Sequence, residues 1–132
     1  MIPRGLRNQN PLNIRHGSSK WKGMARDQTD TQFVQFTSME YGYRAAFVLL
    51  RTYYRKYGCN TITKIINRWA PNNENNTEAY IRHVCQWTGI SPHKLLALND
   101  ANTWIAIVRA MSRVENGQEA SLTQVTQGWR MV

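Results

Sequence analysis

Apolar side chains recur along most of this chain at the three- and four-residue spacing of amphipathic helices. Toward the C-terminal end, for instance, Trp104, Ile107 and Met111 fall on one helical face, while Arg109 falls on the solvent side. Residue types that favour helix starts, and glycines that favour helix ends, separate these stretches. The pattern predicts six helical segments, at residues 39–58, 60–71, 76–89, 91–98, 99–117 and 121–132.

The N-terminal part of the chain follows a different pattern. Residues 1–20 are rich in Asn, Arg, Gly and Pro, which favours a loop or short turns. Residues 20–38 alternate weakly around a polar RDQTD turn, which predicts a small β ribbon within residues 15–37. We therefore expect residues 1–132 to form one domain that is mainly α (α+β), with five to six helices and one small β ribbon near the N-terminus.

The chain is strongly basic, with 17 Lys and Arg against eight Asp and Glu and a formal net charge of +9. This charge favours a polyanionic partner: nucleic acid, an anionic membrane surface, or a bacterial wall with its attached acidic polymers. No apolar run approaches the roughly 18 residues needed to span a bilayer. The polar N-terminal stretch lacks the apolar core of a classical secretion signal. We therefore expect a soluble protein. If it acts outside a cytoplasm, we expect another component to carry it there.

Few residues offer the usual catalytic or metal-binding patterns. His16, His83 and His93 are scattered, and there is no phosphate-binding glycine loop or cluster of metal ligands, so neither a cofactor nor a metal is expected. Cys59 and Cys85 form no CxxC pair. A disulfide between them stays open, although two free and largely buried thiols are favoured.

Glu115 is the residue that raises a chemical question. It lies at the end of a predicted helix, two residues before Gly117, where the helix dipole disfavours a carboxylate. One interpretation is a chance acid on a solvated surface. The other is a carboxyl group with a raised pKa that serves as a general acid. The many Asn, Tyr and Trp residues suit a sugar ligand, although Asn also satisfies turns.

The stretch AIVRAMSRVENGQEAS resembles the Glu-Ser-Gly and Ala-x-Ser element of the lysozyme-like lytic transglycosylases, with Glu115 in the place of the catalytic glutamate and Asn116 in the place of the serine. NTITKIINRWAPNNENNTEAYIRHV is similar to two later segments of that family. RGLRNQNPLNIR, at the start of this chain, is similar to the part that follows the catalytic helix. The order implies a circular permutation, with the catalytic helix moved toward the end. The chain also looks like small phage proteins described as virion structural proteins or wall hydrolases.

The resemblance implies a lysozyme-like domain that cleaves the MurNAc-GlcNAc β-1,4 bond of peptidoglycan, as a lytic transglycosylase or a muramidase, with Glu115 as its single acid and base. It also implies peptidoglycan strands and other virion proteins as partners, and a location in the virion, the periplasm or the cell wall. Residues 8–14 should then lie beside Glu115. The substrate-binding residues implied are Glu74, Asn10, Asn13 and Asn67.

The sequence leaves three alternatives. The acid of such an enzyme could instead be Glu40, although acids in a first helical turn usually stabilise the helix. A non-enzymatic nucleic-acid module, less favoured, could use the basic and aromatic stretch RTYYRKYG together with Arg44. The third is an inactive virion protein that keeps a lysozyme-like fold, since fold alone does not give function.

Overall fold

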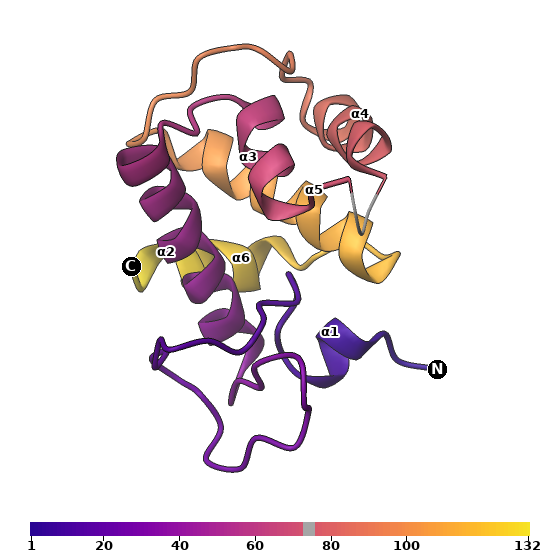
Figure 1. The fold of residues 1–132 in the computed structure, drawn as a ribbon, viewed down its shortest axis with the longest axis vertical. Helices are drawn as coiled ribbons and strands as arrows, with labels where there is room; N and C mark the ends of the chain where they lie inside the picture. Colours follow the sequence, from indigo (N-terminus) through magenta and orange to yellow (C-terminus); the bar gives the residue numbers. More distant parts are fainter. Residues whose placement is uncertain (73–75) are drawn as a thin grey trace.

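The computed structural model describes residues 1–72 and 76–132, and this part of the chain is mainly helical (Figure 1). Five of the six expected helical segments are confirmed, and a one-turn helix is added near the N-terminus. The helices are α1 (Arg4–Arg7), α2 (Met39–Tyr57), α3 (Ile62–Trp69), α4 (Thr77–Thr88), α5 (Ala101–Asn116) and α6 (Leu122–Arg130).

Local capping explains why the predicted helix ends are close to the observed ones. The side chains of Ser38, Thr61, Asn76 and Ser121 each accept a backbone N–H from the first turn of the helix that follows. Three helices end at glycines in the left-handed conformation, where a side chain would be strained. These glycines are Gly58, Gly89 and Gly117.

The predicted helix at residues 91–98 is wrong. Lys94 N–H donates to the Ser91 carbonyl in a single turn, but the other backbone bonds of the segment go to neighbouring elements. Leu96 N–H donates to the Asn60 carbonyl at 2.9 Å, and the Tyr54 hydroxyl donates to the Leu96 carbonyl at 2.7 Å. These tertiary bonds hold the segment along the ends of α2 and α3, with the Leu96 side chain buried in the core.

The predicted β ribbon is also not formed. The described residues contain no named strand, and only two isolated bridges, Arg15 with Phe33 and Met24 with Phe36, mark the expected hairpin. Side chains supply hydrogen bonds that two paired strands would otherwise form between their backbones. Asn10 is fully buried, its amide nitrogen donates to the Ile14 and Val34 carbonyls, and its oxygen accepts Ile14 N–H.

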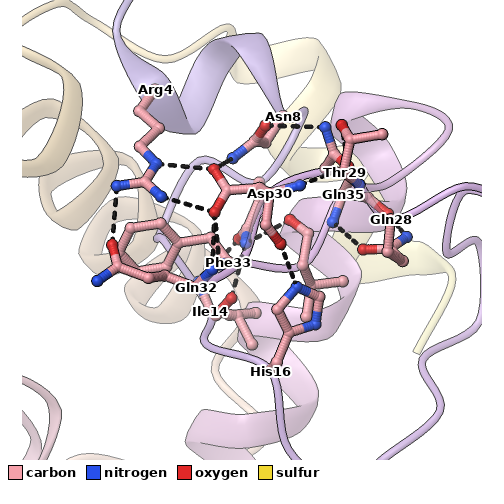
Figure 2. Close-up of polar contacts among 12 residues, drawn as sticks. Arg4, Asn8, Ile14, His16, Gln28, Thr29, Asp30, Gln32, Phe33 and Gln35 are labelled. Carbon is pink, nitrogen blue, oxygen red and sulfur yellow. Dashed lines mark hydrogen bonds and ion pairs between the residues drawn. The ribbon is translucent and has the colours of Figure 1, made fainter.

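Glutamine and aspartate side chains also form hydrogen bonds with the backbone further along the segment (Figure 2). Gln28 donates to the Gln35 carbonyl and accepts Gln35 N–H, as a neighbouring strand would. The Asp30 carboxylate accepts the backbone N–H groups of Gln32 and Phe33. Side chains thus bond to backbone groups of residues 14, 32, 33, 34 and 35, which positions the segment without a sheet.

Two groups of buried side chains hold the elements together. The larger one lies among α2, α3, α4, α5 and α6, with Tyr43, Ile66 and Trp104 among its members. The smaller one, formed by Ile14, Val34, Phe36 and Ala45, attaches the N-terminal segment to α2. α1 packs against the C-terminal end of α5, which brings the first residues of the chain to one of its last helices (Figure 1).

Two simpler sequence expectations can be compared with the structure. Cys59 and Cys85 are both free, the first buried and the second partly exposed. Among the described residues, no helix combines the length and the apolar character that a membrane crossing requires.

Candidate functional site

Glu115 lies in the last turn of α5 and is partly buried. The helix extends this far because its apolar face packs in the core, where Ile107, Val108 and Met111 are fully buried. Gly117 then ends the helix with a φ of 73°. The carboxylate is therefore carried on a rigid element and turned toward the N-terminal segment.

Two side chains from distant parts of the chain bind the two oxygens of this carboxylate. The amide nitrogen of Asn13 donates to Glu115 Oε1 at 2.9 Å, across 102 residues of sequence. The Tyr80 hydroxyl, on α4, donates to Glu115 Oε2 at 2.9 Å. The expectation that residues 8–14 lie beside Glu115 is confirmed at Asn13.

Burial makes this carboxyl group a weaker acid than an exposed glutamate. Loss of contact with water raises the pKa of Glu115, and the hydrogen bonds from Asn13 and Tyr80 only partly oppose that rise. The pKa of Tyr80 is raised well above its ordinary value, first by its own burial and then by the negative charge of Glu115 and by their hydrogen bond. Tyr80 therefore stays a neutral hydroxyl beside a carboxyl group that holds its proton more firmly than usual.

The two partners can serve both protonation states of Glu115. An amide nitrogen can only donate, so Asn13 requires Oε1 to act as an acceptor in either state. A phenolic hydroxyl both donates and accepts, so Tyr80 can accept a proton carried on Oε2. The geometry thus places the titrating proton on Oε2, on the side of Tyr80.

Asn116, the next residue, fixes the position of the N-terminal segment. Its amide nitrogen donates to the Pro11 carbonyl at 2.7 Å and to the Ser112 carbonyl at 2.9 Å. Asn13 follows Pro11 by two residues and has a φ of 52°, a left-handed conformation that asparagine tolerates better than most residues. The backbone turn around Asn13 therefore depends on a side chain of α5.

Gly5 of α1 makes this close packing feasible. A Cβ atom at this position would lie 2.6 Å from Asn116 Oδ1 and 3.1 Å from Asn13 Oδ1. Both of these oxygens are buried and have no conventional hydrogen-bond donor among the described residues. A side chain at residue 5 would push apart the two asparagines that surround Glu115.

A groove of about 300 Å³ adjoins Asn13 on the side of α2. Its walls carry aromatic rings from three elements: Trp21 of the N-terminal segment, Tyr53 of α2 and Trp69 of α3. Asn13 belongs both to this groove and to the hydrogen-bonded group around Glu115. Flat aromatic faces beside amide and carboxyl groups are the surfaces that bind carbohydrate rings.

Asn10 and Asn67, which were also expected at the site, differ from Asn13 in burial and in hydrogen bonding. Asn10 has no exposed surface and its amide is bonded to the backbone of Ile14 and Val34, so its expected contact with a ligand is replaced by a structural role. Asn67 is exposed on α3, and its amide donates to the Thr63 carbonyl one turn earlier. Glu74 lies outside the described residues.

Sequence reasoning did not assign roles to Tyr80 and Asn116. Tyr80 lies on the buried face of α4, and a buried tyrosine hydroxyl usually has a hydrogen-bond partner. That rule could have marked Tyr80 as a residue with a polar contact. It could not have identified Glu115 as the partner, because the contact depends on how α4 packs against α5.

Comparison with known proteins identifies a bacteriophage relative of the chain. No model of a known protein family matches it. Over 117 residues it is 46% identical to Protein P5 of Pseudoalteromonas phage PM2, and the alignment covers 86% of this chain and 71% of the phage protein. The name of that protein states no activity. At this identity and coverage, the chain belongs to the same family as bacteriophage Protein P5.

Proposed function

We propose that this protein cleaves the glycan strands of peptidoglycan, with Glu115 as its single acid and base and with bacteriophage infection as its setting. The observation that carries the proposal is the Glu115 carboxyl group itself. It is partly buried, its pKa is raised, and it is bound by Asn13 and Tyr80 beside an aromatic groove.

In the proposed reaction, Glu115 gives its proton to the glycosidic oxygen as the bond to the sugar breaks. Glycoside hydrolysis usually uses two carboxylates, but the N-acetyl group of the substrate can take the place of the second one. The Glu115 carboxylate then removes a proton from the attacking hydroxyl. A water molecule as attacker gives a muramidase product, and the 6-hydroxyl of the sugar gives the anhydro product of a lytic transglycosylase.

The partners of Glu115 suit this cycle because they tolerate its gain and loss of a proton. Asn13 donates to Oε1 throughout, while the Tyr80 hydroxyl can accept from protonated Oε2 and donate to the carboxylate that remains. Proton transfer by such a positioned group contributes about 10²–10⁴-fold to a rate. The groove beside Asn13 would hold the sugar rings, with Trp21 and Trp69 as stacking surfaces.

The charge and the family support a setting in the bacterial wall. A formal net charge of +9 favours encounter with acidic wall polymers. The relative is encoded by a bacteriophage, and phages have to cross the wall of their host. We propose the virion, or delivery from it to the periplasm and cell wall, as the location, with other virion proteins as neighbours.

Glu115→Gln is the variant that tests this function. Gln keeps nearly the same size and can bond to Asn13 and Tyr80, but it cannot donate a proton as a carboxylic acid does. We expect release of muropeptides from purified peptidoglycan to fall by about 10²–10⁴-fold. The measurement is mass analysis of the products, which also separates anhydro ends from reducing ends.

Glu40→Gln is the matched control, since it removes the same charge from the first turn of α2. Lysis should survive this change. The stability of Glu115→Gln is a second control, because the raised pKa of Glu115 gives stability at low pH that is lost as pH rises through that pKa. The variant should therefore unfold no more easily than the wild type near neutral pH. Full lysis by Glu115→Gln, or no lysis by the wild type, would refute the proposal.

The nucleic-acid alternative has weaker support from the side chains. Its expected stacking surface is the tyrosine face of α2, but the Arg68 guanidinium already lies 3.4 Å from the Tyr57 ring centroid and 5.1 Å from that of Tyr53. Those ring faces are therefore partly occupied by a cation of the protein itself. An inactive structural protein of the virion is the outcome that the peptidoglycan assay would reveal if the wild type released nothing.

A further inference from the structure

A second pocket, of about 310 Å³, lies between α2, α6 and the start of α5. Its floor is apolar, and Trp104 contributes a ring that is only 2% exposed and whose nitrogen is already bonded to the Ala97 carbonyl. Phe47 and Trp129 meet edge to face in its wall, with ring centroids 5.2 Å apart. The pocket is lined by Phe47, Arg51, Arg55, Leu98, Asn99, Trp104, Trp129 and Val132.

This pocket is separate from the groove beside Asn13, because the two lie on opposite faces of α2. Phe47, Arg51 and Arg55 are spaced four residues apart and share one face of the helix. Leu49 and Tyr53, which line the groove, fall on the opposite face at 100° per residue. A ligand in the second pocket would therefore not touch Glu115.

Two cations stand at this apolar pocket. Arg51 is partly buried and Arg55 is exposed, and neither guanidinium forms an ion pair or a side-chain hydrogen bond within the described part of the chain. Arginine stays charged at any physiological pH, and its planar group matches a carboxylate with two parallel hydrogen bonds. The pocket thus combines aromatic surface for an apolar group with charge for one anionic end.

We propose that this pocket binds a small amphipathic carboxylate, with its apolar part on Trp104, Phe47 and Trp129 and its carboxylate on Arg51 and Arg55. The volume is at the lower end of the range of about 300–1,000 Å³ found for ligand pockets, which suits one aliphatic chain or one ring. The same chemistry occurs in a free fatty acid and in the C-terminal residue of a peptide that ends in an apolar side chain.

Calorimetric titration of the intact protein tests the proposal. Decanoate, below the concentration at which it forms micelles, should bind with one-to-one stoichiometry. Decanol and decylammonium, which keep the chain but lack the anion, should bind at least about tenfold more weakly, as expected for loss of a charged hydrogen bond. A dipeptide ending in leucine, compared with the same dipeptide amidated at its C-terminus, tests whether the ligand is the end of a peptide. Whichever of decanoate and the dipeptide binds more tightly identifies the class of ligand, fatty acid or peptide.

The double variant Arg51→Gln/Arg55→Gln should weaken decanoate binding by at least about tenfold while leaving thermal unfolding unchanged. Lys22→Gln/Arg26→Gln is the matched control, because it removes two exposed positive charges from the N-terminal segment. Its affinity for decanoate should equal that of the wild type. The proposal is overturned if neither carboxylate binds, if decylammonium binds as well as decanoate, or if both double variants lose affinity equally.

Discussion

The two carboxylate oxygens of Glu115 accept hydrogen bonds from the Asn13 amide and the Tyr80 hydroxyl. Burial raises the pKa of Glu115, and each of these two hydrogen bonds lowers it in part. The balance at this residue can be altered one group at a time. The Tyr80 hydroxyl donates to Oε2, so removing it takes away a bond that favours the charged carboxylate. The pKa of Glu115 should then rise further.

Tyr80→Phe is therefore expected to move the alkaline limb of the pH–rate profile of lysis to higher pH, since the carboxyl group keeps its proton longer. The measurement is the pH dependence of kcat/KM on soluble peptidoglycan fragments. Tyr54→Phe is the matched control, because its hydroxyl bonds to the Leu96 carbonyl and not to the site. A profile for Tyr80→Phe that coincides with the profile for Tyr54→Phe would contradict the proton assignment.

At the scale of elements, the N-terminal segment is held by side chains where a sheet would use its backbone. Asp30 is central, since its carboxylate accepts two bonds of 2.7 Å from Arg4 and one of 2.9 Å from Asn8 (Figure 2). These donors, together with backbone N–H groups, hold the pKa of Asp30 far below its usual range. A depressed pKa contributes stability that is present above the unfolded pKa and is lost as pH falls.

Asp30→Asn should lower the melting temperature at neutral pH and make it less dependent on acid. In the wild type, the loss of stability should begin as pH falls toward about 4, where an aspartate in an unfolded chain starts to bind protons. Thermal unfolding followed across this pH range is the measurement. Asp27→Asn, at an exposed position of the same segment, is the control and should keep the wild-type acid dependence. Equal behaviour of the two variants would show that the Asp30 contacts contribute nothing.

The contrast between helices and the N-terminal segment also shows what the sequence could reveal. Helix starts and ends depend on residues within one turn, so Ser38 and Gly58 marked their positions locally. The segment at 91–98 and the absent ribbon depend on partners far away in sequence, such as Asn60 for Leu96. Propensity carries no information on such partners, and tertiary bonds overrode it.

The candidate site was predictable in part for the same reason. Glu115 was conspicuous because its position opposes the helix dipole, and the resemblance placed Asn13 near it. Asn10 and Asn13 are alike in the sequence, however, and only packing distinguishes them. One is fully buried and bonded to the backbone, whereas the other reaches the carboxylate.

At the scale of the whole molecule, the net charge of +9 should govern encounter with the substrate more than the reaction itself. Exposed charges are screened over about 8–10 Å at physiological ionic strength, whereas a partly buried pair is screened much less. Raising the salt concentration should therefore weaken adsorption to whole walls.

Kinetic measurements separate these two effects. On whole walls KM should rise with salt and kcat should stay nearly constant, while turnover of a short uncharged oligosaccharide should hardly respond. Added muropeptide should displace the wall but leave any binding to DNA intact, which distinguishes the two polyanions. A kcat that falls steeply with salt would contradict this division between the surface and the site.

Asn13 leaves the ribosome 102 residues ahead of Glu115. Until α5 has been synthesised, a growing chain contains neither the carboxyl group nor Asn116, whose amide holds the Pro11 carbonyl. A product of translation that stops before the end of α5 cannot carry the proposed activity, however well its earlier helices form. If the proposed activity is directed at the wall of the cell that makes the protein, that cell would meet the active form only after α5 has been translated, a delay built into the order of the two residues along the chain.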